Sequence, residues 1–347
     1  MKLFNYFTKN FGIDLGTANT LIYVAGRGIV VNEPSVVALN AKTGVVVASG
    51  EEARKMVGRT PNHVNVVRPL TNGVISDFET TQEMLRQFMR KVGYGKFPSY
   101  HRAVLGAPSN LTEVERKSVE DAALGAGIHK AFIIEESIAA ALGARLPVDE
   151  PTANLIVDVG GGTTEIAVIS MGGTVVAKSL KVAGDRLNED IIRFVRDEFR
   201  LAIGDPTAEE VKITIGSAMP LEQKMEMTVR GRDLATGLPN EIIIRDAQVR
   251  AAIGKSLKTI VEAVKEVIEV TPPELAGDIL RRGIYLCGGG SLLRGIDQYM
   301  SKDLQVSAAI VEDPLTCVAR GTGIAVENFS KYMAILHNPF TPREIRL

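Results

Sequence analysis

The chain of 347 residues contains no tryptophan and only two cysteines, Cys287 and Cys317. Both cysteines lie in apolar, glycine-rich surroundings and lack the spacing of a metal site or a disulfide framework, so we expect two buried, reduced thiols. No apolar run approaches the roughly 18 residues that span a bilayer, and the first residues lack the apolar core of a signal peptide. These absences predict a soluble, cytoplasmic protein.

An excess of either charge is also missing, because 40 basic residues balance 41 acidic ones. No basic run is interleaved with aromatic residues, so nothing indicates a general affinity for nucleic acid. The length exceeds the size at which a single hydrophobic core stops growing, and two domains are therefore expected.

The chain does contain two short acidic, glycine-bearing loops, at residues 14–17 (DLGT) and 158–163 (DVGGGT). Each loop follows an apolar strand-like run and precedes another, so each is predicted to be a hairpin turn. The backbone amides of such a turn can converge on phosphate oxygens when no Cβ blocks the approach. Glycine and small hydroxyl residues suit this task.

The aspartates of these loops, Asp14 and Asp158, would repel a phosphate unless a cation lay between them. Mg²⁺ is a hard cation that usually keeps several of its waters, and it has the required chemistry. A single loop of this kind is often an ordinary turn. Two loops in matching surroundings indicate a duplicated fold that binds one nucleotide from both sides.

Strands and helices alternate along both halves of the chain, which predicts an α/β sandwich. Strands are expected at 11–15, 20–25, 29–31, 35–39, 45–49, 103–107, 131–134 and 283–286, with a hairpin at 155–181 and a small β-containing insertion formed by 225–230 and 241–245. Helices are expected at 77–92, capped by Asp77 or Thr80, from Thr112 to about 125, where a TxxE capping signature begins the helix, and at 137–146, 187–202 and 246–270. Three glycines, 288–290, follow the last strand and permit close approach of a ligand.

The first residues show a further pattern, because Leu3, Phe4, Phe7 and Phe11 follow helical spacing with polar residues elsewhere on the wheel. Such a helix can lie on a membrane surface, where lysines on its flank gain from anionic lipid. The alternative is that these side chains pack on the chain's own core just before the first strand.

Several segments closely resemble the MreB family of bacterial actins, within the superfamily of actin, heat-shock chaperones and sugar kinases. The segments are 12–20 (GIDLGTANT), 32–38 (NEPSVVA), 58–61 (GRTP), 68–69 (RP), 73–78 (GVISDF), 231–234 (GRDL) and 271–276 (TPPELA). The resemblance extends over nearly the whole chain. It implies an α/β, actin-like (ribonuclease H-like) duplicated fold, with two domains and four subdomains around a central nucleotide cleft.

The resemblance also implies subdomain boundaries. Subdomain IA would comprise 1–31 and 73–150, with 326–347 packing back near it, IB 32–72, IIA 151–184 and 247–325, and IIB 185–246.

By the same resemblance, ATP or ADP with Mg²⁺ would be bound by two phosphate loops and an adenosine pocket. The residues are Asp14, Gly16, Thr17, Ala18 and Asn19 in the first loop, Asp158, Gly160, Gly161, Gly162 and Thr163 in the second, and Glu209, Lys212, Gly288, Gly289 and Gly290 around the adenosine. Asp14 and Asp158 would hold Mg²⁺ mainly through water. Glu209 and Lys212 could instead form only a solvated ion pair, and Ile213-Thr214 follows where the family has charged residues.

Hydrolysis of the γ-phosphate mainly requires positioning and charge neutralisation, so a carboxylate that orients the attacking water is expected. Glu136 stands where the family has this glutamate, and Thr163 would help to hold the water. Glu135 is adjacent, but alternate side chains of an extended segment face opposite ways, so only one of the two can readily face the nucleotide. Ser137 replaces the family's usual proline.

The implied function is a slow ATPase that polymerises into membrane-associated filaments and organises cell-wall synthesis to maintain rod shape. Its partners would be further copies of itself, as single or paired protofilaments, the inner face of the cytoplasmic membrane, and membrane proteins of cell-wall elongation. Leu3, Phe4 and Phe7, or Tyr94 and Phe97 in the link before Arg102, would contact the membrane.

Two alternatives share the same superfamily. A small-molecule kinase acting on a sugar or an acid would need a base for the acceptor hydroxyl, and the sequence offers no second acidic site that is an evident candidate for this base. A chaperone ATPase would carry a substrate-binding domain after the nucleotide fold, which we do not expect here.

Overall fold

The structure is a computed structural model that describes residues 8–92 and 99–336. It divides into two compact units. Unit 1 consists of Met1–Thr152, Ile169–Val175 and Leu315–Leu347, and unit 2 consists of Ala153–Val168 and Val176–Pro314. The four subdomain boundaries inferred from the sequence remain a prediction.

Unit 1 is built on a mixed sheet with the strand order β10-β9-β1-β2-β3. The strands are β1 (Thr8–Leu15), β2 (Asn19–Val24), β3 (Gly28–Pro34), β9 (Ser99–Ala107) and β10 (Lys130–Glu135). β1, β2 and β3 form an antiparallel meander, whereas β1, β9 and β10 run parallel. The carboxyl ends of the parallel strands therefore meet at one edge, where α/β folds commonly bind ligands.

Unit 1 contains the helices α2 (Phe78–Lys91), α3 (Glu113–Gly125), α4 (Glu136–Gly143), α10 (Cys317–Glu327) and α11 (Phe329–Tyr332), the last followed by a 3-10 turn, η4 (Met333–Ile335). Three of these helices, α2, α3 and α4, begin within one residue of the predicted starts, whereas α10 was not predicted. Asp77 caps α2 by accepting a hydrogen bond from the Thr80 amide at 3.0 Å. Thr112 and Glu115 form the predicted capping box of α3.

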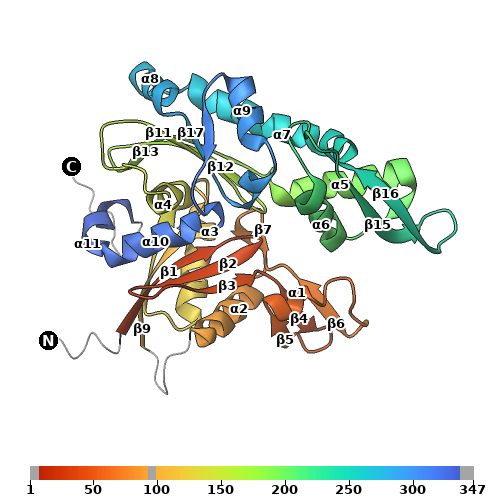
Figure 1. Ribbon diagram of the computed structural model, residues 1–347. Coiled ribbons are helices and arrows are strands. Elements are labelled where there is room, and N and C mark those ends of the chain that lie inside the picture. Colours follow the sequence, from red (N-terminus) through yellow and green to blue (C-terminus); the bar gives the residue numbers. More distant parts are fainter. Residues whose placement is uncertain (1–7, 93–98, 337–347) are drawn as a thin grey trace. The chain divides into compact units, whose positions relative to one another are not determined.

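Helices α4 and α10 pack against each other unusually closely in unit 1 (Figure 1). A Cβ atom on Gly143 would lie 1.9 Å from the carbonyl oxygen of Cys317, and one on Gly321 would lie 1.7 Å from that of Ala139. Only glycine fits at these two positions, because backbone occupies the space of the side chain.

A smaller lobe of unit 1 leaves the main sheet after β3 and returns before α2. This small lobe, residues 36–72, contains a three-stranded sheet of β4 (Val37–Asn40), β5 (Val46–Ser49) and β6 (Val64–Val67) and a short helix α1 (Glu51–Arg54). A hairpin of β7 (Leu70–Thr71) and β8 (Val74–Ile75) then leads from the lobe to α2. The lobe's own buried cluster is small and centres on Val36, Ala38, Ala48 and Ala53.

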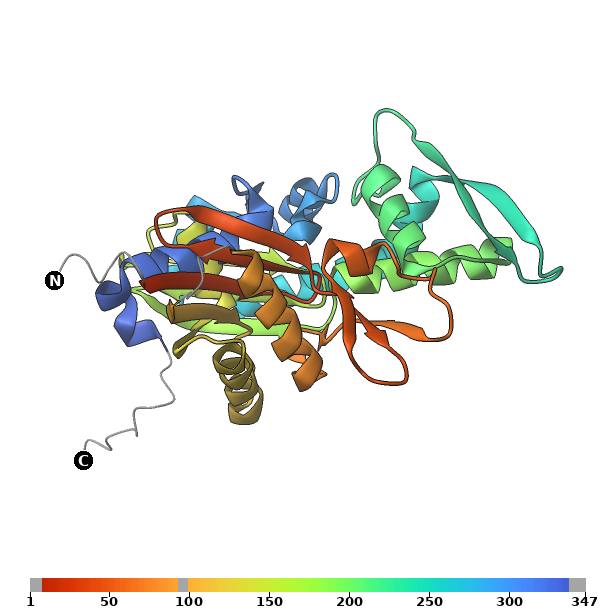
Figure 2. The ribbon, with the colours of Figure 1, turned by 90° about the horizontal axis from the view of Figure 1, so that it is seen from below.

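Unit 2 is built around a sheet with the order β13-β12-β11-β17-β18. Its strands are β11 (Asn154–Val159), β12 (Thr164–Ser170), β13 (Gly173–Leu180), β17 (Ile284–Cys287) and β18 (Ala308–Ile310). The helices are α5 (Gly184–Phe199), α6 (Asp205–Ile215), α7 (Asp246–Glu269), α8 (Pro273–Arg282) and α9 (Ile296–Leu304), with 3-10 turns η2 (Gly289–Leu292) and η3 (Pro314–Thr316). Figure 2 shows the hairpin of β15 (Glu226–Asp233) and β16 (Pro239–Arg245) projecting beyond α5 and α6; β14 (Leu201–Ala202) completes its sheet. This hairpin is the predicted β-containing insertion.

Each unit has its own hydrophobic core, and the core of unit 1 corrects one expectation. Helical spacing groups Phe11 with an N-terminal helix, but Phe11 lies within β1 and is fully buried, in agreement with the predicted strand at 11–15 and the alternative of core packing. Hydrogen-bonded strands on both sides of β1 exclude a helix there, so helical spacing at this residue is coincidental. Leu3, Phe4 and Phe7 lie outside the described residues, as do Tyr94 and Phe97.

Both cysteines are buried free thiols, as predicted. Among the described residues, no helix is both long and apolar enough to cross a bilayer.

Candidate functional site

The first predicted phosphate loop lies at the carboxyl edge of the parallel strands of unit 1. Asp14 of β1 pairs with Gly106 of β9, and Gly106 pairs with Ile134 of β10. Three adjacent strands therefore bring Asp14, Gly106 and the start of α4 to the same level of the sheet. The first loop, residues 16–18, follows directly as the turn between β1 and β2.

Glu135 and Glu136 have different surroundings at this edge. The Glu135 carboxylate accepts a hydrogen bond from the Thr174 hydroxyl at 2.7 Å. Glu136 is the first residue of α4, and its Cγ lies 3.5 Å from the position that a Cβ on Gly106 would occupy. Glu136, and not Glu135, therefore lies beside Gly106, which is the strand partner of Asp14. This position supports the choice of Glu136 as the water-orienting carboxylate.

The second predicted phosphate loop lies between β11 and β12 in unit 2. The Gly160 amide donates to the Thr163 carbonyl at 2.9 Å and closes the turn. The Gly184 amide then donates to the Gly160 carbonyl at 3.1 Å, and the Asp185 amide to the Gly161 carbonyl at 2.8 Å. The loop is therefore fixed to the N-terminus of α5, whose dipole favours an anion nearby.

Asp158 precedes this loop and pairs with Cys287 on the neighbouring strand. A Cβ on Gly288 would lie 2.2 Å from Asp158 Oδ1, so glycine is required where the chain passes this carboxylate. Burial and the negative charge of Glu165 raise the pKa of Asp158 from 3.8 to about 7, although a hydrogen bond from the Cys287 thiol acts in the opposite direction.

This environment fits a magnesium ion, because a nearby cation would compensate for the burial of the Asp158 charge. Within residues 8–92 and 99–336, no group of three His, Cys, Asp or Glu side chains is arranged to hold a metal by itself. The magnesium ion predicted at Asp14 and Asp158 stays a prediction, and in that prediction water supplies most of its ligands.

Glu209 and Lys212 form an ion pair on α6, with Lys212 Nζ 2.9 Å from a Glu209 carboxylate oxygen. Their surroundings differ from those of a solvated surface pair. The Lys212 side chain is only 13% exposed and donates to the Gly184 carbonyl at 3.0 Å, while Asn188 donates to Glu209 at 2.6 Å. Gly184 thereby connects Lys212 with the second loop.

Sequence reasoning missed three residues that build the site, namely Gly106, Gly184 and Cys287. Each is a lone residue at the end of a strand or the start of a helix, where no periodic pattern marks it. Only the pairing of distant strands reveals that Gly106 faces Asp14 and that Cys287 faces Asp158.

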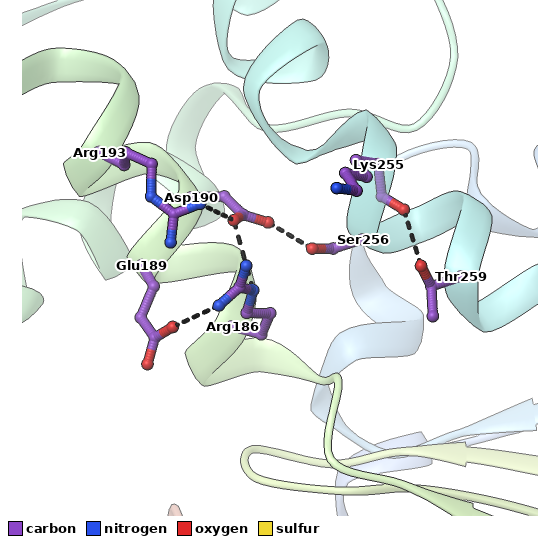
Figure 3. A network of polar contacts seen from close by, with 7 residues as sticks. All are labelled: Arg186, Glu189, Asp190, Arg193, Lys255, Ser256 and Thr259. Atoms are coloured by element: carbon purple, nitrogen blue, oxygen red, sulfur yellow. Dashed lines mark hydrogen bonds and ion pairs between the residues drawn. The ribbon is translucent and has the colours of Figure 1, made fainter. Parts of the chain in front are cut away.

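Unit 2 also contains a polar groove of about 450 Å³ between α5 and α7. Figure 3 shows its floor, where Arg186 and Arg193 approach the Asp190 carboxylate and Ser256 donates a hydrogen bond to it. None of the predicted nucleotide-binding residues lines this groove. Asp190 is already neutralised by its own arginines, so the groove is a structural ion-pair network rather than the candidate site.

Comparison with known proteins agrees with the resemblance seen in the sequence. The family model described as MreB/Mbl protein matches residues 8–334. The chain is 46% identical to the cell shape-determining protein Mbl of Bacillus subtilis over 94% of this chain and 98% of that protein. It is also 46% identical to the cell shape-determining protein MreB of Escherichia coli K12, over 94% of this chain and 95% of that protein.

The structure superimposes on MreB5 of Spiroplasma citri bound to ADP with a TM-score of 0.90, at 41% identity over 94% of this chain and 98% of that one. A second structure of MreB5, bound to AMPPNP, gives a TM-score of 0.89 with the same coverage. These matches confirm the actin-like α/β fold. The chain therefore belongs to the MreB/Mbl family.

Proposed function

We propose that this chain is a bacterial actin that binds and slowly hydrolyses ATP, polymerises into membrane-associated filaments and organises cell-wall synthesis to maintain rod shape. The observation that carries the proposal is the placement of Glu136 beside Gly106, the strand partner of Asp14, next to the first phosphate loop. The names of the relatives, cell shape-determining proteins, and the ADP and AMPPNP bound to MreB5 support the same conclusion.

In this proposal, the two loops donate backbone hydrogen bonds to the phosphates of one nucleotide. Glu209, Lys212 and Gly288–Gly290 contact the adenosine, and Asp14 and Asp158 hold Mg²⁺, largely through water. The ion supplies charge neutralisation for the transferred phosphoryl group. Glu136 accepts a hydrogen bond from the attacking water and thereby orients it, and the Thr163 hydroxyl holds the same water.

Assembly would use a head-to-tail contact between copies of the chain, which generates an open filament. Many weak membrane contacts on one filament would add up through avidity, so a short N-terminal helix would suffice for peripheral attachment to the inner face of the cytoplasmic membrane. Membrane proteins of cell-wall elongation would then meet the filament at this surface.

Co-sedimentation tests the proposal. The purified chain is centrifuged alone and with anionic liposomes, with and without Mg-ATP, while phosphate release is followed. We expect nucleotide-dependent pelleting and slow release of phosphate without any added acceptor. ATP consumption that rises only with a small-molecule acceptor, together with no sedimentation under any condition, would instead identify the kinase.

A further inference from the structure

The first phosphate loop is joined to a serine that lies outside it. Ser35 is fully buried in the connection from β3 to β4, and its hydroxyl donates a hydrogen bond to the Gly16 carbonyl at 2.7 Å. Its backbone amide donates to the Ala18 carbonyl at 2.9 Å. One residue therefore holds the loop at both ends of the Gly16–Ala18 segment.

Thr20 fixes the orientation of this serine. The oxygens of the Thr20 and Ser35 hydroxyls are 2.8 Å apart, and Thr20 is also fully buried. A hydroxyl has a single hydrogen to donate, and that of Ser35 is used on Gly16. Thr20 must therefore be the donor in this pair, which gives a directed chain from Thr20 to Ser35 to the loop carbonyl.

The loop has a second external contact on its other side. The Gly73 amide donates to Thr17 Oγ1 at 3.0 Å. Gly73 and Asn72 form the two-residue turn between β7 and β8, and both have positive φ, as a type I′ turn requires. Because Thr17 accepts this bond, its own hydroxyl hydrogen is left for another acceptor, such as a phosphate oxygen.

These contacts have a topological consequence. Ser35 lies where the chain enters the small lobe of residues 36–72, and Gly73 lies where it leaves. The phosphate loop is therefore hydrogen-bonded to both chain connections between the main sheet of unit 1 and this lobe. A buried hydrogen bond is costly to break without a replacement, so a shift of the loop should move Ser35 and Gly73 with it.

We propose that Ser35, oriented by Thr20, is a positioning residue for the first phosphate loop and joins the occupancy of that loop to the order of segment 36–72. Ser35 acts through the loop and makes no contact with the nucleotide. This inference rests on the proposed nucleotide-binding function, and its test separates the two.

The test compares three substitutions with the wild-type chain. Ser35→Ala removes the donor to Gly16, Thr20→Ala removes the donor to Ser35, and Thr20→Ser keeps that donor. Ser49→Ala is the matched control, because Ser49 is buried in β5 of the same lobe and donates one hydrogen bond to Gln87 at 2.8 Å, away from the loop. It should lower thermal stability to a similar degree without disturbing the loop.

Affinity for ADP and for adenosine is measured by competition against a fluorescent ADP. In Ser35→Ala and Thr20→Ala we expect ADP to bind about fivefold more weakly, the effect of losing one hydrogen bond, with adenosine unchanged. Thr20→Ser and Ser49→Ala should behave as wild type. An equal loss for adenosine, or unchanged ADP binding in Ser35→Ala, would overturn the positioning role.

Hydrogen exchange measured at saturating ADP tests the connection to the lobe. We expect ADP to slow exchange across 36–72 in wild type and Ser49→Ala, and to slow it less in Ser35→Ala. An identical response in all three, or no response in a wild type that binds ADP, contradicts the connection alone. A wild-type chain that binds neither ADP nor adenosine refutes the proposed function, and this inference with it.

Discussion

Glu135 and Glu136, at the start of α4, can be compared directly for their effect on ATP turnover. Glu136 lies beside Gly106 at the phosphate edge, whereas Glu135 is hydrogen-bonded to Thr174. We predict that Glu136→Ala lowers ATP turnover by roughly 100-fold while ATP still binds, because the attacking water loses its orienting base.

Single-turnover phosphate release with a parallel binding measurement checks this prediction. Glu135→Ala serves as the control, and we expect it to retain most of the activity. The assignment is wrong if the two variants exchange roles or if Glu136→Ala hydrolyses ATP at the wild-type rate.

Asp158 makes stability depend on pH. Its pKa is about 7 in the folded chain and near 3.8 when unfolded, so between these values the folded state holds an extra proton, and the chain loses stability as the pH rises from about 3.8 to about 7. Asn at this position has no charge and still accepts a hydrogen bond from Cys287. We predict that, without nucleotide or Mg²⁺, the stability of Asp158→Asn relative to wild type increases by about 2 kcal/mol between pH 5.5 and pH 8, at about 1.4 kcal/mol per pH unit up to pH 7.

Urea unfolding of both proteins in the presence of a chelator, at the two pH values, measures this difference. A stability gap that stays constant, or that narrows toward pH 8, would show that Asp158 is already ionised at low pH. The same substitution should weaken the binding of the magnesium nucleotide, in contrast to its effect on stability.

At the scale of elements, the contact between α4 and α10 holds Glu136 in place. Gly321→Ala would push a methyl group into the Ala139 carbonyl, so we predict a loss of at least about 2 kcal/mol in stability. Gly254→Ala in the middle of α7 is the control. Its Cβ would meet no atom within 4 Å, and it should stabilise the chain by about 0.5–1 kcal/mol.

Thermal unfolding of the two variants gives opposite shifts if the close packing is as described. Equal shifts of either sign would mean that α10 can move away from α4 at little cost. Turnover should fall in Gly321→Ala and stay unchanged in Gly254→Ala, since only the first displaces the start of α4.

Elements with strong local signals could be predicted from the sequence, and elements defined by distant pairing could not. The cap at Asp77, the capping box at Thr112 and the apolar stripe of α7 all lie within a few residues of the features they mark. Phe11 fitted both a helical spacing and the predicted strand at 11–15, and only the pairing of β1 with β2 and β9 decides for the strand. Ser35 belongs to no periodic pattern, and its role depends on a loop 19 residues away.

At the scale of the whole molecule, the predicted nucleotide residues are divided between the two units. Asp14, Thr17 and Glu136 belong to unit 1, while Asp158 and Lys212 belong to unit 2. The fold and the family could be read from the sequence because the two loops and the family motifs are contiguous. Filament contacts could not, because a head-to-tail interface joins unlike surfaces that share no pattern.

Deletion of residues 1–10 would reach into β1, so a membrane test is better made with a milder change. We predict that replacing Leu3, Phe4 and Phe7 by serine abolishes most pelleting with anionic liposomes, because apolar burial in the headgroup region is lost. ATP-dependent pelleting without liposomes should persist. Liposome binding that survives the triple replacement would point to Tyr94 and Phe97.

The burial of Asp158 also has a calorimetric consequence. With a pKa of about 7, this carboxyl is roughly half protonated at neutral pH, and an arriving cation would displace that proton into the buffer. The heat of binding of Mg-ADP should therefore change with the ionisation enthalpy of the buffer, with a slope of about half a proton at pH 7. In Asp158→Asn this slope should vanish, because asparagine carries no titrating proton. The comparison would show that binding of the magnesium nucleotide releases a proton from Asp158.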